Sequence, residues 1–183
     1  MSRIPLAGVE QQPEPIRDFM ARRGALNAFR LLANAPNVFV GWSQMVDELF
    51  DSPTYSLRMR EVVILRVARL QNSRYELGQH IEIGREAGLT EQQISAIVET
   101  EDLDAAGFSR TERLVLDVVT ELCSTHRLSD DSFATARAEL GDGGLTELLM
   151  IVSCYYGLAL VLNAVDLDAD TDARFQARGG QTQ

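Results

Sequence analysis

The chain has 183 residues, of which 45% are hydrophobic and only five are proline, a composition that suits one globular domain with a substantial core. Its 17 basic and 27 acidic residues give a formal net charge of −10 at pH 7, which argues against binding to nucleic acids or to anionic membranes, because both need a basic face. All 17 basic residues are arginines, so mechanisms that require a lysine, such as Schiff-base catalysis or the Walker phosphate loop, are excluded.

Helical periodicity dominates the chain after an N-terminal segment, residues 1–15, whose prolines predict an extended arm. No later segment alternates with a period of two for long enough to form a strand. The sequence therefore predicts an all-α, single-domain helical bundle of about seven to eight helices over residues 16–168, followed by a disordered tail, residues 169–183. The expected helices are 16–33, 38–50, 57–70, 74–87, 90–98, 109–126, 130–140 and the apolar run 148–165.

Capping boxes at Thr90 to Gln93 and at Ser109 to Glu112 mark the starts of two of these helices. The glycine-rich stretch 141–144 separates the 130–140 helix from the apolar run 148–165. That run is uncharged, but it is of marginal length for a membrane span and its flanks are acidic, so we expect a buried helix. The N-terminus lacks the apolar core of a signal peptide, and we expect a cytoplasmic protein.

Two ionisable residues, Glu61 and His80, fall on helix faces that the pattern predicts to be buried. On a helical wheel Leu57, Ile64 and Leu65 surround Glu61, which places the carboxyl inside the apolar stripe. His80 lies on the apolar face of the next expected helix. Ionisable groups on faces of this kind are often functional.

The helices that carry Glu61 and His80 should pack antiparallel, because the connection around Gln71 and Asn72 is short. Glu61 is 11 residues before Asn72 and His80 is 8 after it. At about 1.5 Å per residue these positions lie about 16 and 12 Å from the turn, less than one helical turn apart in height. Glu76 is one turn before His80 on the same face and can hydrogen-bond to it. The spacing is consistent with a proton relay, in which Glu76 or Glu61 orients His80 and His80 moves a proton.

Each of these residues also has a structural interpretation. Ser73 to Glu76 matches a capping box, in which Glu76 would hold the start of the helix. Glu61 could pair with an arginine of a neighbouring helix, and His80 could be a satisfied core histidine. Trp42 lies on an apolar stripe and is most simply a core residue, with the wall of a binding site as the alternative. Neither a metal nor a cofactor is expected, because no second histidine lies near and no His-Glu-x-x-His or dinucleotide motif occurs.

The stretches Arg60 to Ala68 and Tyr75 to Ile94 resemble the carboxymuconolactone decarboxylase family, whose superfamily also holds the alkyl hydroperoxidase D proteins. The later blocks 133–140 and 145–163 resemble the longer members, so the likeness covers most of residues 35–166. The resemblance implies an all-helical fold of the alkyl hydroperoxidase D-like type. It also implies assembly into trimers or hexamers, with the site close to subunit contacts.

The peroxidase branch of this superfamily works through a glutamate, a Cys-x-x-Cys motif and a histidine. This chain matches the glutamate at Glu61 and the histidine at His80, but it has Ser73 and Glu76 at the two cysteine positions. Without those thiols the disulfide-cycling peroxidase mechanism cannot run. The two cysteines of the chain match neither position, and we expect them to be reduced and buried.

The decarboxylase branch is the closer resemblance, through Glu76 and His80 four residues apart and the Gly-Leu-Thr that follows them. It implies a cofactor-independent lyase that removes carbon dioxide from a small unsaturated lactone or carboxylate. His80 would donate the proton, with Glu76 or Glu61 setting its tautomer, and Ser73 and Trp42 would bind the small-molecule substrate. The alternatives are an alkyl hydroperoxidase D-like member without the catalytic dithiol and a non-catalytic oligomeric binding protein.

Overall fold

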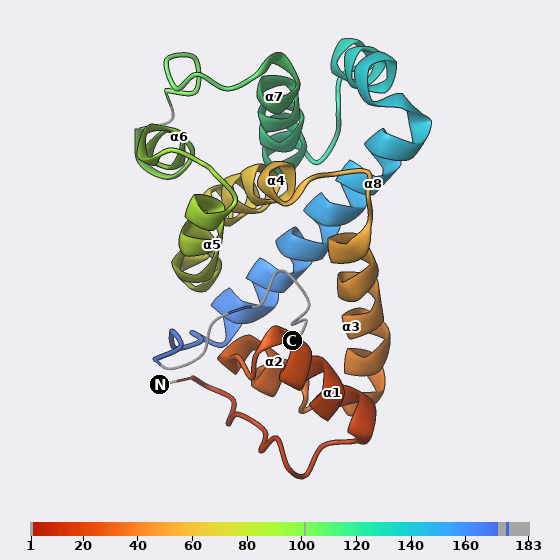
Figure 1. Ribbon diagram of the computed structural model, residues 1–183, viewed down its shortest axis with the longest axis vertical. Coiled ribbons are helices and arrows are strands. Elements are labelled where there is room, and N and C mark those ends of the chain that lie inside the picture. The colour runs from red at the N-terminus through yellow and green to blue at the C-terminus, as the bar shows by residue number, and fades with distance from the viewer. Residues whose placement is uncertain (1, 101, 172–174, 176–183) are drawn as a thin grey trace. The chain divides into compact units, whose positions relative to one another are not determined.

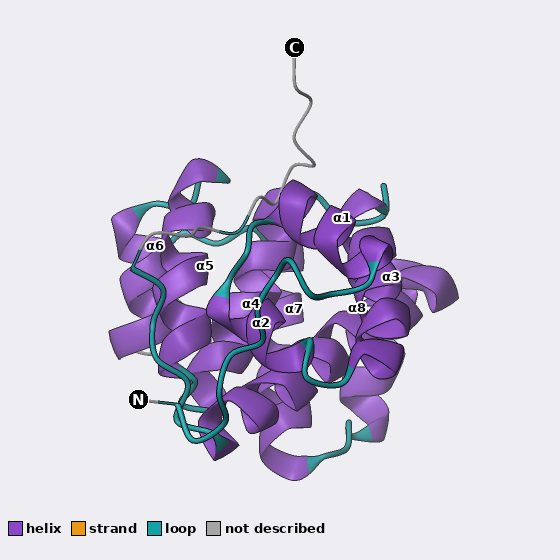
Figure 2. Cartoon of the chain, turned by 90° about the horizontal axis from the view of Figure 1, so that it is seen from below, coloured by secondary structure: helices purple, strands orange, loops and turns teal. Residues whose placement is uncertain are grey.

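The chain is all helical in the computed structural model, which describes residues 2–100, 102–171 and 175 (Figure 1). Figure 2 shows helices and loops but no strand in this part of the chain. The predicted all-α fold is confirmed. The elements are α1 (Glu14–Arg23), α2 (Asn27–Leu32), α3 (Pro36–Asp51), α4 (Leu57–Leu70), α5 (Arg74–Glu86), α6 (Glu91–Ser95), the π-helical segment η1 (Ala96–Thr100), α7 (Arg110–Thr125) and α8 (Asp130–Ala164).

These elements fall into two compact units. The first comprises Met1–Ser52 and Leu162–Gln183 and contains α1, α2 and α3. The second comprises Pro53–Val161 and contains α4 to α7 with most of α8. The predicted disordered tail, residues 169–183, lies outside the described residues except for 169–171 and 175.

An aromatic cluster forms much of the core of the first unit. Phe19 of α1, Phe29 of α2, and Phe39 and Trp42 of α3 lie with their ring centroids 4.9 to 6.4 Å apart. The pairs are mostly edge-on or tilted, the arrangements that the quadrupoles of aromatic rings favour. Trp42 contacts this cluster of rings but is only partly buried, so it lies at the edge of the core.

The first unit differs from the sequence prediction in its opening helices. A single helix was expected over 16–33, but Gly24, with φ 100° and ψ 145°, ends α1, and α2 begins only at Asn27. Glycine adopts this positive φ without the steric cost that a side chain would bring. The break changes the direction of the chain, so the short α2 can place Phe29 against Phe19.

Helix α4 is the centre of the second unit. It packs against α5 on one side and α7 on the other, as Figure 1 shows. Nine of its 14 residues are buried, from Arg60 to Ala68 without interruption. A tight turn through Asn72, which has φ 51°, leads from α4 into α5, and the Ser73 amide donates to the carbonyl of Ala68. This antiparallel hairpin is the arrangement that the short connection predicted.

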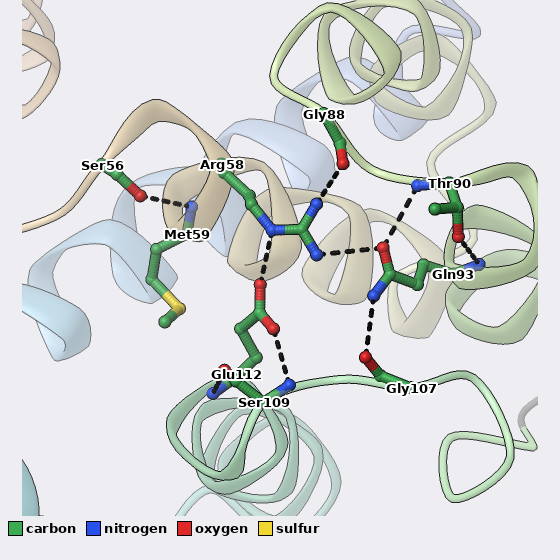
Figure 3. Close-up of polar contacts among 9 residues, drawn as sticks. All are labelled: Ser56, Arg58, Met59, Gly88, Thr90, Gln93, Gly107, Ser109 and Glu112. Atoms are coloured by element: carbon green, nitrogen blue, oxygen red, sulfur yellow. Dashed lines mark hydrogen bonds and ion pairs between the residues drawn. The ribbon is translucent and has the colours of Figure 1, made fainter.

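Arg58 of α4 joins α6, α7 and the loop that follows α5 in the second unit (Figure 3). Its Nε donates to Glu112 at 2.7 Å, one Nη donates to the side chain of Gln93 at 2.9 Å, and the other donates to the carbonyl of Gly88. Glu112 and Gln93 are also the third residues of their helices, where they complete the predicted capping boxes at Ser109 and Thr90, and both boxes are confirmed. One guanidinium thus fixes the starts of α6 and α7 against α4.

Helix α8 changes direction at Gly141, whose φ of 72° and ψ of 171° interrupt the helical backbone. This break falls in the glycine-rich stretch where the sequence predicted the end of a helix. Leu148, Ile151 and Ala159 are buried, whereas Met150 and Leu160 are 45% and 53% exposed. Among the described residues α8 is the one helix long and apolar enough to cross a membrane, a property that core helices of soluble proteins share.

Candidate functional site

The α4–α5 hairpin brings Glu61 and His80 into direct contact. The Nδ1 atom of His80 lies 2.8 Å from Oε2 of Glu61, and both residues belong to the second unit. Glu61 has no exposed surface and His80 is 5% exposed. The alternative in which Glu61 pairs with an arginine is wrong, because its carboxylate binds the imidazole instead. A carboxylate at this distance accepts a hydrogen bond from the Nδ1–H group and so selects the tautomer of the ring.

Glu76 stands on the other side of the same imidazole. Its Oε2 lies 3.6 Å from Nε2 of His80, one helical turn further along α5. This distance makes an ion pair but exceeds that of a hydrogen bond, so the hydrogen bond expected from the sequence is not formed. The ring of His80 therefore lies between two carboxyl groups, with one ring nitrogen directed at each.

Burial and mutual charge shift the protonation of this cluster. Burial raises the pKa of Glu76 from 4.5 to about 7, an effect that His80 opposes and Glu61 reinforces. Burial by itself would lower the pKa of His80, but the charge and hydrogen bond of Glu61, together with the charge of Glu76, outweigh it and raise that pKa. Glu76 therefore titrates close to neutral pH, and the raised pKa of His80 favours the protonated imidazole, so both groups are suited to exchange protons.

Tyr155 of α8 contacts the cluster from a third element. Its ring lies 5.3 Å from the ring of His80 at an interplanar angle of 88° and is 7% exposed. The sequence placed Tyr155 only in an apolar run, because no local pattern indicates which distant residue a helix face will meet. The neighbouring Tyr156 did not indicate this contact either.

Ser73 occupies the N-cap position before α5, but its side chain does not cap the helix. Its hydroxyl makes no capping hydrogen bond, so the capping-box interpretation of Ser73 and Glu76 is wrong. Ser73 has no exposed surface, and its Oγ has no hydrogen-bond partner in the described part of the chain. A buried hydroxyl without a partner costs free energy, which is unusual in a folded protein unless the group serves another purpose. Ser73 lies on the same face of α5 as Glu76 and His80, three and seven residues before them.

Trp42, the other predicted binding residue, lies in the first unit, in the aromatic cluster of α1, α2 and α3. Cys123 and Cys154 are both buried, as expected, and form no disulfide in the described part of the chain. Burial raises the pKa of the Cys123 thiol to about 11, with a smaller opposing effect from Arg66, so Cys123 is a poor nucleophile at neutral pH.

Over residues 2–100 and 102–171 no group of three or more His, Cys, Asp or Glu side chains could hold a metal ion.

The fold and the cluster together define a class: an all-helical protein with a buried glutamate–histidine–glutamate site on a central helical hairpin. Residues 36–120 match the carboxymuconolactone decarboxylase family, and this range contains Glu61, Ser73, Glu76 and His80. No curated protein sequence matches the chain.

Solved structures share the fold over most of the chain. A peroxidase-related protein from Ralstonia eutropha, described as an alkylhydroperoxidase core, is 18% identical with a TM-score of 0.78, and 93% of each chain is covered. A peroxidase-related protein from Silicibacter is 15% identical with a TM-score of 0.74, over 97% of this chain and 96% of that one. A protein of unknown function from Agrobacterium tumefaciens is 17% identical with a TM-score of 0.68, over 77% of this chain and 96% of that one.

Residues 36–120 are therefore similar to the carboxymuconolactone decarboxylase family, and the all-helical fold of the chain is shared with the alkylhydroperoxidase core structure. The chain has no Cys-x-x-Cys motif, because its two cysteines are Cys123 and Cys154.

Proposed function

We propose that the chain is a cofactor-independent carbon–carbon lyase that acts on a small unsaturated lactone or carboxylate by proton transfer. The observation that carries this proposal is the position of His80 between Glu61, at 2.8 Å, and Glu76, at 3.6 Å, in a buried cluster. Such a cluster can hold one exchangeable proton in a water-poor site, where its electrostatic interactions are strong.

The reaction needs little beyond a proton and a site that excludes water. When the bond between the substrate and its carboxylate breaks, carbon dioxide leaves and the electron pair moves through the adjacent double bond onto the lactone carbonyl oxygen. A proton from the cluster then adds to carbon, and the electron pair returns from oxygen to form the new carbon–hydrogen bond. Glu61 would hold the imidazole in place throughout, since its carboxylate is sealed from solvent.

The buried hydroxyl of Ser73 supports a role in substrate binding. Its Oγ lacks a partner among the described side chains and lies on the face of α5 that carries Glu76 and His80. A hydroxyl in that position could donate to the carbonyl or carboxylate oxygen of a substrate, in the manner of an oxyanion-hole donor.

A thiol peroxidase is the competing function, and the names of two structural relatives point to it. The chemistry of this chain favours the lyase, because no cysteine occupies either position next to His80. Cys123 is buried, and its raised pKa leaves little thiolate at neutral pH. A peroxidase cycle needs a thiolate that attacks the peroxide and a second thiol that resolves the product.

One experiment separates the two functions. The purified chain is incubated either with carboxymuconolactone, with release of carbon dioxide as the readout, or with an alkyl hydroperoxide and a dithiol donor. We expect decarboxylation, and we expect the Cys123→Ala and Cys154→Ala variants to keep it. Peroxide turnover that disappears in either cysteine variant, without any decarboxylation, would overturn the proposal.

We also propose that the chain assembles with copies of itself, as the family resemblance implies for a trimer or hexamer. The exposed apolar side chains of α8, Met150, Leu160 and Val161, support this proposal, because large apolar residues on one helix face often lie in interfaces. Light scattering of the purified chain tests it: a monomer at micromolar concentration would contradict the proposal.

A further inference from the structure

Each ring nitrogen of the His80 imidazole faces a carboxyl group. Nδ1 lies 2.8 Å from Glu61 and Nε2 faces Glu76 at 3.6 Å. An imidazole has only these two polar atoms, so a proton that leaves the ring passes to one of the two carboxyl groups. The ring of Tyr155 also lies against the imidazole, at 5.3 Å between centroids.

The two carboxyl groups differ in what they can do next. The side chain of Glu61 is 0% exposed and hydrogen-bonds to Nδ1 of His80 at 2.8 Å, so its part is to orient the ring. The side chain of Glu76 is 4% exposed, and its carboxyl makes one ionic contact, with His80, and no hydrogen bond to any described residue. A carboxyl group has two oxygens, so one can receive a proton from His80 while the other delivers a proton elsewhere.

We propose that Glu76, and not His80, is the group that exchanges its proton with the substrate, and that His80 is a positioning residue that reloads Glu76. This assignment rests on the proposed function and deepens it. The sequence resemblance gave the donor role to His80, whereas the positions of the two ring nitrogens assign it to Glu76.

The steps balance without any further reactant. Carbon dioxide leaves the substrate, and the electron pair of the broken bond rests on the conjugated carbonyl oxygen. Protonated Glu76 gives its proton to carbon and becomes a carboxylate. The imidazolium of His80 returns a proton from Nε2 to Glu76, and water reprotonates His80 between turnovers. The net reaction consumes one proton for each carbon dioxide released.

The protonation of Glu76 is consistent with this role. Its pKa of about 7 keeps a large fraction of the carboxyl protonated at neutral pH, where an ordinary glutamate would be ionised. A donor of this strength is well matched to a carbon that becomes basic only after carbon dioxide has left.

The first test needs no substrate. An infrared spectrum at a pH of about 6 should contain the signal of a protonated carboxyl group, because Glu76 titrates at about 7. The Glu76→Gln variant should lose this signal. The Glu82→Gln variant, which changes a carboxyl 51% exposed on the same helix, should keep it. If the wild-type protein lacks the signal, Glu76 has no proton to give and the assignment is wrong.

The second test uses carboxymuconolactone. We expect Glu76→Gln to lower kcat by at least about 100-fold, the usual contribution of a general acid, and formate to restore part of the activity of Glu76→Ala. We expect Glu82→Gln to behave as the wild-type protein. If Glu76→Gln stays within about threefold of wild type while His80→Gln is inactive, His80 is the direct donor and only this inference fails. If both variants stay within about threefold, the proposed function fails as well.

Discussion

Oε2 of Glu61 and Nδ1 of His80 lie 2.8 Å apart, although 19 residues and a helix–helix turn separate them in the sequence. Both residues are almost fully buried, and neither helix could bury its ionisable residue without the other. The contact therefore links folding to chemistry: the hairpin that packs α4 against α5 also fixes which tautomer of the imidazole is present.

Removal of the charge at Glu61 should change the titration of His80. In Glu61→Gln the amide can still accept from Nδ1–H, but the negative charge of Glu61 is gone and only that of Glu76 still opposes burial, so the pKa of His80 should fall relative to the wild-type protein. The measurement is an NMR titration of the ring signals. The chain has only two histidines, and the exposed His126 serves as the internal reference. An unchanged pKa of His80 would contradict the proposed coupling.

Stability should fall as the pH rises from about 4.5 to about 7. Across this window the unfolded chain has released the proton of Glu76, whereas the folded chain retains it, so each increase in pH favours the unfolded state. The shift from 4.5 to about 7 corresponds to about 3 kcal/mol. The raised pKa of His80 acts in the same direction above 6.5, because its stabilising proton is lost as the pH rises through the folded value.

Glu76→Gln isolates the contribution of Glu76, because glutamine has no proton to lose in this range. Urea unfolding at several pH values should give a flatter curve for the variant than for the wild-type protein, with most of the difference between pH about 4.5 and 6.5. Parallel curves for the two proteins would show that Glu76 titrates in the folded chain as it does in the unfolded one.

Ser73→Ala should separate stability from function. The Oγ atom has no partner among the residues that the structure describes, so its removal should leave the free energy of unfolding unchanged or raise it by about 1 kcal/mol. The same variant should raise the KM for the lactone by about tenfold, because the substrate loses a hydrogen-bond donor. Ser109→Ala is the matched control. Its hydroxyl caps α7, so this change should cost about 1 kcal/mol. A similar loss in Ser73→Ala would mean that Ser73 has a structural role.

Arg58→Ala should destabilise the second unit more than an ordinary surface change. The guanidinium donates to Glu112, Gln93 and Gly88, and these groups stay partly buried without it, so we expect a loss of about 2 to 4 kcal/mol. Arg58→Lys should recover only part of this loss, because an ammonium group cannot reach three acceptors in a fork. Arg110→Ala, which removes a side chain 89% exposed and 3.9 Å from Glu139, should have no measurable effect on thermal unfolding.

The sequence predicted the features of the site that depend on local periodicity. The wheel placed Glu61 and His80 on buried faces, and the short turn placed them at similar heights. Both follow from helix geometry alone, because residues on one face repeat every three to four positions. The capping boxes at Thr90 and Ser109 were also predictable, since each is complete within four residues.

Features that depend on tertiary contacts were missed or wrong. A single glycine interrupts an apolar helical pattern only weakly. The periodicity therefore predicted one helix across Gly24, where the structure has a break. The approach of Tyr155 to His80 joins residues 75 positions apart, and no local signal encodes it. Ser73 matched a capping box by residue type, but its hydroxyl lies buried instead of bonding to the first turn of α5.

The most direct measurement of the central claim is the turnover of carboxymuconolactone by His80→Gln beside the wild-type protein, with circular dichroism to verify that both are folded. Glutamine keeps a polar side chain of similar reach but cannot carry a proton between Glu61 and Glu76. The relay predicts that kcat falls by at least about 100-fold while the helical signal stays the same. A folded His80→Gln variant that decarboxylates the lactone within about threefold of the wild-type rate would contradict the relay.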